Sequence, residues 1–311
     1  MSDNESEIDI VKYLGLNNTN ELAELLSKST LETLQPGKNF IYNSSHYFEI
    51  DDISKNYVSD MDHKDNNPEF STVRNDEFDL NSIENAGLSE SRSHVGWRCV
   101  LNYNEKNNGS YDRNNSTYRG IAEKCRPLDC GHILGLGLFQ YIEPRQILKK
   151  QKSRLNSGKE IKDNGNQKLQ EICNNVKYNL FPQFPRANRN PDLEYKHDIG
   201  QERFEEVVRD RIKEKYDDKV YYEIEKIYFD SKNDEIPVGT RIFASVVDEY
   251  SEPNSGKELA LPFHVFIPNY AVSDSEWQRG DTDYDLDYLL KNNSSKIRDL
   301  YRDFYGHDWR K

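Results

Sequence analysis

The chain has 311 residues, of which 35% are hydrophobic and 31% are charged, and it includes 20 Tyr and 13 Phe. This composition excludes a wholly disordered chain and is enough for one large domain with appendages. The net charge is −13, but the first 90 residues hold 19 acidic and 6 basic side chains, and the other 36 acidic residues are balanced by 36 basic ones. A local basic surface in the rest of the chain is therefore not excluded.

From the sequence we expect neither a targeting signal nor a set of disulfide bonds. No apolar run approaches the roughly 20 residues of a membrane helix, so we expect no membrane association. The stretch Met1–Glu5 has no basic n-region and no apolar segment follows it, so we expect a protein that is cytoplasmic or exported by a non-Sec route. The four cysteines are expected to be reduced thiols. They are Cys99, Cys125, Cys130 and Cys173.

Residues 1–90 are expected to form an acidic N-terminal region, partly helical and partly irregular. Four leucines have helical spacing between Glu21 and Leu34, and Pro36-Gly37 ends the predicted helix. The composition favours a solvated appendage that the chemistry does not need, with a docking or targeting element as the alternative.

Residues 91–275 carry the patterns of a folded domain. Phe204, Val207, Val208 and Ile212 predict a helix with one apolar face. Alternating apolar residues predict a set of strands. These strands are Val95–Tyr103, Val220–Phe229, Arg241–Val247 and Pro262–Ile267. Residues 276–311 are expected to be a helical extension packed on this domain, because apolar residues recur there at helical spacing. The order of elements predicts an α+β fold with a mainly antiparallel sheet.

The first chemical motif is Asp129-Cys130-Gly131-His132. Glycine before the histidine lets the backbone turn sharply or approach a ligand closely. The ordinary pKa of a histidine side chain, about 6.5, suits proton transfer near neutral pH. Asp129 is close enough in the chain to orient the imidazole or to hold a nearby polar group.

The second motif lies between Asn179 and Asn190 and is rich in amides and basic residues. A polar loop is the plain interpretation, because Asn and Pro favour turns. The functional interpretation is a metal and phosphate site. An Asn oxygen suits a hard divalent cation, and Arg186 and Arg189 can each grip a phosphate with two donors.

Together these motifs resemble a known family. Asp129-x-Gly-His132 resembles the Asp-Arg-Gly-His signature of the DNA/RNA non-specific endonucleases, which are ββα-metal (His-Me finger) nucleases. Asn179-x-x-Pro182-Gln183-x-x-x-x-Asn188 resembles the second motif of that family, and Phe204-Glu205 resembles its hydrophobic-Glu pair. The resemblance covers about residues 94–270, and it is nearest to the bacterial branch that includes secreted toxins and streptococcal-type nucleases.

The resemblance implies a metal-dependent endonuclease that cuts DNA, RNA or both without sequence preference. It implies that His132 is the general base and that Asn188 holds one Mg²⁺, for which Mn²⁺ may substitute. Glu205 is then expected to hold the water shell of the ion, with Glu202 and Glu206 as competitors. The resemblance also implies that Asn179 orients the site and that Asp129 supports the His132 strand or the waters of the metal.

Cys130 stands where the family has Arg, so Arg126 is expected to take over phosphate binding. Two other functions remain open: an inactive homologue that only binds nucleic acid, and a zinc module that uses Cys125, Cys130 and His132. A nuclease of this kind endangers its own cell, so an immunity or inhibitor protein is an expected partner, and a toxin or defence role would explain it.

Overall fold

The computed structural model describes part of the chain, and the findings below concern only that part. It comprises residues 7–27, 33–43, 46–51, 96–103, 125, 128–139, 141, 179–189, 199–229, 236–246 and 259–270. The helices are α1 (Glu7–Tyr13), α2 (Thr19–Ser27), α6 (Leu136–Phe139), α9 (Pro185–Asn188) and α10 (Gln201–Glu214). The strands are β1 (Phe40–Asn43), β2 (Tyr47–Ile50), β3 (Gly96–Asn102), β4 (Asp129–His132), β5 (Leu180–Gln183), β6 (Lys219–Ile227), β7 (Gly239–Val246) and β8 (Phe263–Pro268).

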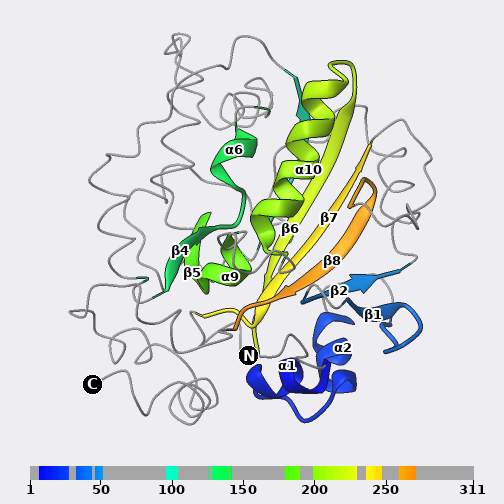
Figure 1. Ribbon diagram of the computed structural model, residues 1–311, viewed down its shortest axis with the longest axis vertical. Coiled ribbons are helices and arrows are strands. Elements are labelled where there is room, and N and C mark those ends of the chain that lie inside the picture. Colours follow the sequence, from blue (N-terminus) through cyan, green and yellow to red (C-terminus); the bar gives the residue numbers. More distant parts are fainter. Residues whose placement is uncertain are drawn as a thin grey trace, which may run out of the picture.

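A six-stranded sheet is the centre of the structure. Its strand order is β1-β2-β8-β7-β6-β3, and every pairing in it is antiparallel. The β4 and β5 strands pair with each other in a separate antiparallel ribbon. Figure 1 shows this ribbon beside the N-terminal end of α10. The fold is therefore α+β with a mainly antiparallel sheet, as the sequence predicts.

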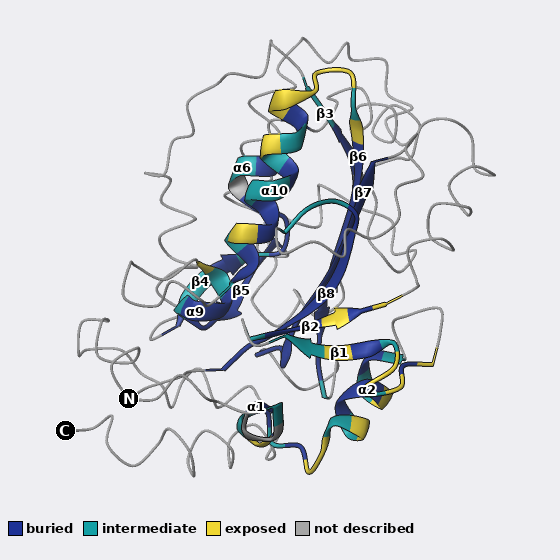
Figure 2. Ribbon diagram, turned by 45° about the vertical axis from the view of Figure 1, so that its right-hand side comes forward, coloured by how far each residue is buried: buried dark blue, intermediate teal, exposed yellow. Residues whose placement is uncertain are grey.

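Helix α10 covers one face of the sheet (Figure 1). Its buried residues Phe204, Val208 and Ile212 are four residues apart, so they form one stripe along the helix. They belong to the same apolar core as Tyr222 and Ile224 of β6. The opposite side of the helix carries exposed residues, which Figure 2 shows as the yellow turns of α10. Burial of this stripe explains why α10 and β6 stay together.

The β6, β7 and β8 strands are buried almost throughout (Figure 2). The alternation of a strand sends neighbouring side chains to opposite faces, so these strands need partners on both faces. One face packs on α10, and the other carries the fully buried Arg241. Its guanidinium donates to the carboxylates of Glu223 and Glu225 and also contacts His264. These contacts satisfy charges that would otherwise be very costly to bury.

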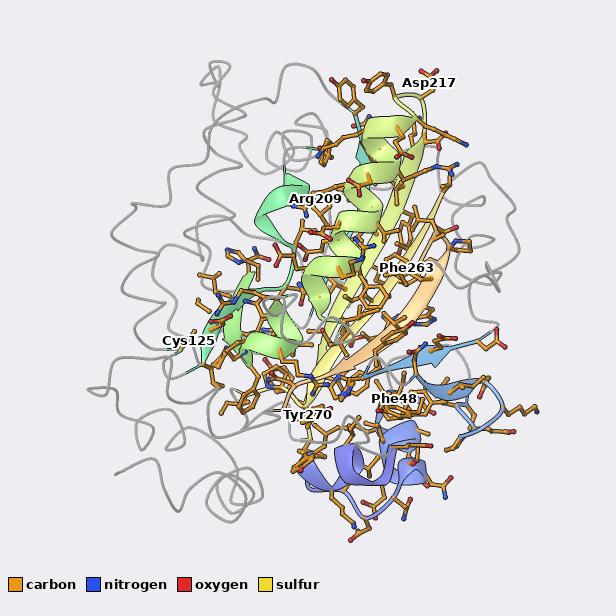
Figure 3. All side chains as sticks on the ribbon, in the orientation of Figure 1. Phe48, Cys125, Arg209, Asp217, Phe263 and Tyr270 are labelled. Carbon is orange, nitrogen blue, oxygen red and sulfur yellow. The ribbon has the colours of Figure 1, made fainter. Side chains whose placement is uncertain are left out.

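The N-terminal part of the chain contributes to the sheet. Strands β1 and β2 pair with each other, and β2 pairs with β8. The Phe40 and Phe48 rings stack at 4.7 Å, and Phe48 and Tyr270, labelled in Figure 3, belong with α1 and α2 to a second apolar core. The expectation of a solvated appendage is therefore wrong for residues 40–43 and 47–50, because they pair in the sheet and Phe40, Tyr47, Phe48 and Ile50 are buried.

The predicted elements agree with the structure in kind and differ at their ends. The four predicted strands of residues 91–275 and the helix around Phe204 are present. The helix predicted to reach Leu34 ends at Ser27. The polar-loop interpretation of Asn179–Gln183 is wrong from Leu180 onward, because these residues form β5. The helix predicted within residues 276–311 lies outside the described residues. Within the described part, no helix is long and apolar enough to span a membrane.

Candidate active site

The ribbon of β4 and β5 brings the two sequence motifs together. Asp129 pairs with Gln183 and His132 pairs with Leu180. Gly131 is buried opposite Phe181, and a Cβ added there would lie 2.2 Å from Gln183 Oε1. Glycine is therefore required at this position, because any larger residue would displace the Gln183 side chain. Asp129 and His132 were expected on two antiparallel strands, and both lie on β4, one strand of the antiparallel pair.

Asn179 holds the chain just beyond His132. Its side chain is fully buried, accepts a hydrogen bond from the Leu134 N–H (2.9 Å) and donates to the Leu134 carbonyl (3.0 Å). Its own carbonyl accepts from the Ile133 N–H at 2.7 Å. Three hydrogen bonds thus fix the backbone that follows His132. This location agrees with an orienting role and leaves no polar atom of this amide for direct contact with a substrate.

Asp129 holds the end of α9. Its carboxylate accepts from Asn188 Nδ2 at 3.0 Å, and it accepts from Arg189 Nε (2.7 Å) and Nη2 (2.9 Å). The Arg189 side chain is 56% exposed. The bidentate geometry is the strong form of an Arg–carboxylate pair. Of the two roles expected for Asp129, the holding of a nearby polar group is the one for which the structure gives contacts.

Asn188 is oriented by this contact. Because its amide nitrogen faces the Asp129 carboxylate, its carbonyl oxygen Oδ1 points away from that carboxylate. The residue is half-buried. Its backbone N–H donates to the Phe184 carbonyl (3.0 Å), which anchors the short α9 helix.

Glu205 lies on the buried side of α10, against the chain that follows β4. Burial raises its pKa from 4.5 to about 7, opposed by hydrogen bonds from Gln201 and the Gly135 backbone and by the Arg209 charge. A Cβ on Gly135 would lie 1.8 Å from Glu205 Oε2, so this glycine is what lets the carboxylate reach the backbone. Figure 3 shows Arg209 on the side of α10 that faces α6.

The structure distinguishes among the three candidate glutamates. Glu206 pairs with Arg203 (3.0 Å) and Arg209 (3.7 Å) on the surface of α10. Glu202 is half-buried. Only Glu205 among the three is buried, and it alone has contacts with the chain beyond β4. This location favours Glu205 as the acidic residue of the site.

Gln201 is a site residue that the sequence analysis missed. Its Nε2 donates to the His132 carbonyl at 2.6 Å and to Glu205 Oε1 at 2.8 Å. A signal for it exists in the sequence. Gln201 and Glu205 occupy the same helical stripe as Phe204, Val208 and Ile212, and polar residues on a buried stripe need specific partners.

The remaining candidate residues are Arg186, Arg126 and Asn190. The Arg186 side chain is buried, 4% exposed, and its guanidinium lies 4.3 Å from the centre of the Tyr270 ring. This is a packing contact, and it leaves the expected phosphate role of Arg186 without support. Arg126 and Asn190 lie outside the described residues.

The zinc alternative is not supported. Cys125, Cys130 and His132 are all described, and Cys125 is buried whereas Cys130 is half-buried. Among the described residues, no three His, Cys, Asp or Glu side chains are grouped so that they could hold a metal ion. The described residues therefore give no support to a zinc site at the C-x4-C-x-H spacing.

The contacts form two groups. Asp129, Asn188 and Arg189 form one, and Gln201, Glu205 and the His132 backbone form the other. Gln183 joins the two, because its Nε2 donates to the Ala187 carbonyl and to Gln201 Oε1, each at 3.2 Å.

Comparisons with known proteins gave structural likenesses alone. No family model and no curated protein sequence matches this chain. The crystal structure of NucA from Streptococcus agalactiae with magnesium ion bound has a TM-score of 0.42 and 14% identity, covering 83% of this chain and 92% of that one. The structure of the same protein with no metal bound has a TM-score of 0.40 and 15% identity, covering 81% and 90%. The function proposed below therefore rests on the residues of this chain.

Proposed function

We propose that the chain is a metal-dependent endonuclease that hydrolyses phosphodiester bonds of DNA, RNA or both without sequence preference. The observation that carries the proposal is the hydrogen bond from Asn188 to Asp129, 59 residues away in the chain. This contact orients the Asn188 amide against Asp129 of β4, the strand of His132, and the chain that follows this strand contacts Glu205. These are the residue types that a ββα-metal nuclease requires, in the order that the sequence motifs predict.

His132 is the proposed general base. Hydrolysis of a phosphodiester needs a group that removes a proton from the attacking water. Histidine can accept a proton near neutral pH, and His132 is half-buried on β4. The Gln201 contact with its carbonyl and the Asn179 clamp on the next residues hold its backbone in place. A fixed backbone keeps the imidazole in one position relative to a bound phosphate.

Asn188 is the proposed metal ligand, and the donor set fits a magnesium ion. Mg²⁺ prefers oxygen ligands and keeps several waters, so one amide oxygen is a sufficient protein contribution. When bound, Mg²⁺ or a substituting Mn²⁺ would neutralise charge on the phosphate. Asp129 supplies the orientation of the amide, and Glu205 supplies a carboxylate in the second sphere of the site.

Arg189 is the proposed phosphate-binding residue of the described part. Its Nε and Nη2 atoms donate to Asp129, which fixes the guanidinium plane. Recognition through the phosphate backbone explains the absence of sequence preference and makes binding sensitive to salt. Arg126 is proposed to serve where the family has Arg at the position of Cys130. We also propose that export or an inhibitor protein protects the producing cell.

A plasmid-relaxation assay with Mg²⁺ tests the proposal. The wild-type chain should nick supercoiled plasmid and should stop when the metal is chelated. His132→Ala should lose about 10²–10⁴ of the rate, which is the usual contribution of a general base, while its circular dichroism and plasmid binding remain. Glu206→Gln, on the surface of α10, is the control and should keep full activity.

Two results would count against the proposal. Near-normal cleavage by His132→Ala would reject the mechanism. A wild-type chain that binds plasmid without cutting it would favour the inactive-homologue alternative, for which the observation is Cys130 in place of the family Arg.

A further inference from the structure

The segments that carry the proposed chemistry meet at one buried side chain. Gln201 is the first residue of α10 and is 2% exposed. Its Nε2 lies 2.6 Å from the His132 carbonyl oxygen, 2.8 Å from Glu205 Oε1 and 3.2 Å from the Ile133 carbonyl oxygen. One amide group thus contacts both the strand of the proposed base and the buried carboxylate.

The partners of Gln201 leave its amide only one orientation. A main-chain carbonyl can only accept a hydrogen bond, so the nitrogen of Gln201 must face His132 and Ile133. Its oxygen accepts from Gln183 Nε2 at 3.2 Å. The same Gln183 nitrogen donates to the carbonyl of Ala187, the residue before Asn188. A continuous chain of hydrogen bonds therefore runs from the α9 segment through Gln183 and Gln201 to Glu205.

We propose that Gln201 is a positioning residue of the nuclease site. It fixes the Glu205 carboxylate against the His132 strand, and through Gln183 it ties both to the segment that carries Asn188. The catalytic role of Gln201 rests on the proposed function, whereas its position in the fold is given by the hydrogen bonds above. Buried hydrogen bonds of this kind are strong in their low-dielectric surroundings and hold the groups that they join in place.

The pKa of Glu205 depends on its hydrogen bond with Gln201, so it can be used to test that contact. The charged and polar groups that face its carboxylate in the described residues are Gln201, Arg209 and Glu202 of α10 and the Gly135 backbone. A hydrogen bond donated to a carboxylate favours its ionised form. Without Gln201, the carboxylate keeps the Gly135 N–H and the Arg209 charge as stabilising partners. Glu205 should then take up a proton at a higher pH than in the wild type.

The test is a ¹³C NMR titration of the full chain labelled at the glutamate carboxyls, with the Glu205 signal assigned by its loss in Glu205→Gln. Gln201→Met keeps the length of the side chain and removes its hydrogen bonds. We expect its Glu205 midpoint to rise by about one pH unit, the scale of a hydrogen bond to a charged group. Glu214→Gln, at the exposed C-terminal end of the same helix, should leave that midpoint in place.

If Gln201→Met does not fold, a second variant can take its place in the titration. Gln201→Asn keeps the amide but is one methylene shorter, so it should withdraw from Glu205 and raise the midpoint in the same direction. A midpoint that does not move in the folded variant overturns the inference. The acid limb of plasmid cleavage should shift with the midpoint. An inactive wild type would reject the proposed function alone, whereas an active wild type with an unmoved midpoint would reject only the role of Gln201.

Discussion

Two carboxylates near β4 are stabilised in opposite ways. Asp129 is 22% exposed and has a full positive charge beside it, because Arg189 donates two hydrogen bonds to it. Glu205 is buried and has the neutral donor Gln201 as its nearest side-chain partner. The Asp129 carboxylate orients Asn188 through a hydrogen bond, whereas burial raises the pKa of Glu205 to about 7.

Replacement of Asn188 tests the metal ligand. Asn188→Ala should raise the Mg²⁺ concentration for half-maximal activity by about tenfold or more, since loss of even an outer partner of a metal ligand costs about 10–100-fold in affinity. The melting temperature should change little, because the residue is half-buried. Metal titration of plasmid cleavage gives the midpoint.

Arg189→Gln is the matched control for Asn188→Ala. It leaves the Asn188 oxygen in place, so the Mg²⁺ midpoint should stay and binding should become less sensitive to salt. If the midpoint of Asn188→Ala does not move, Asn188 is not the ligand, and Asn190 is the next candidate.

Replacement of Glu205 tests the buried acid without any assay of activity. Because burial raises the Glu205 pKa from 4.5 to about 7, the folded state holds a proton that the unfolded state has released between these values. Stability should therefore fall as pH rises from 4.5 to 7, by up to about 3 kcal/mol. Glu205→Gln mimics the protonated form and removes this loss. Urea denaturation at pH 8 should find the variant more stable than the wild type, and at pH 4.5 the two should be nearly equal. An identical difference at both pH values would show that Glu205 has an ordinary pKa.

At the scale of elements, the β5–α9 segment is attached to the sheet by the end of β8. Asn269 accepts from the Phe184 N–H (2.8 Å) and donates to the carbonyls of Pro182 (3.3 Å) and Pro237 (2.9 Å). Tyr270, labelled in Figure 3, follows it, and the centre of its ring lies 4.3 Å from the Arg186 guanidinium carbon. The short α9 helix could not hold its own position, so these contacts determine where Asn188 lies.

Asn269→Ala tests this attachment. The change removes three hydrogen bonds from a buried location and leaves their partners unsatisfied, which should cost about 1–3 kcal/mol of unfolding free energy. Because α9 loosens, the Mg²⁺ midpoint should also rise. Asn269→Asp keeps the acceptor for Phe184 but sets a carboxylate against two carbonyl oxygens, so it should be at least as destabilising. A stable Asp variant with a normal midpoint would mean that this amide does not determine the position of α9.

At the scale of the whole molecule, the acidic N-terminal region joins the domain that it precedes. Tyr13 of α1 stacks on Tyr270 at 5.6 Å, and His46 Nδ1 contacts the Tyr270 hydroxyl at 2.9 Å. The same Tyr270 ring carries Arg186. Helix α1 and the β1–β2 turn therefore contact Tyr270, the residue on which Arg186 of α9 packs. A domain boundary at residue 90 would divide the six-stranded sheet, because β1 and β2 precede this residue and the other four strands follow it.

A chain that begins at Ser91 should fail to fold. It lacks β1 and β2, so it exposes the edge of β8 and the buried residues Val238, Phe266 and Tyr270. This expectation replaces the earlier one that residues 1–90 are dispensable. Circular dichroism and solubility give the result, and a chain that begins at Gln35, which keeps both strands and loses the two helices, is the comparison. A soluble and cooperatively folding chain from Ser91 would show that the second core is not needed.

The sequence by itself determined the local features of this protein. The apolar stripe of α10 and the alternation of the β-strands follow from side-chain periodicity, which short-range geometry fixes. The motif around His132 and the amides around Asn188 were recognisable because their chemistry lies in the residue types. The acidic partner was narrowed to three glutamates on one helix, and periodicity could not choose among them.

The tertiary structure decided which side chains meet. Asn188 and Asp129 are 59 residues apart, and the choice of Glu205 depends on Gly135, 70 residues away, which has no side chain to keep the carboxylate at a distance. The polar segment at Asn179 became a strand because β4 offers it a partner, and pairing overrides local turn preference. The burial of Arg186, the inclusion of β1 and β2 and the central place of Gln201 have the same cause. Each depends on contacts between residues distant in the chain, and local pattern does not identify the distant partner.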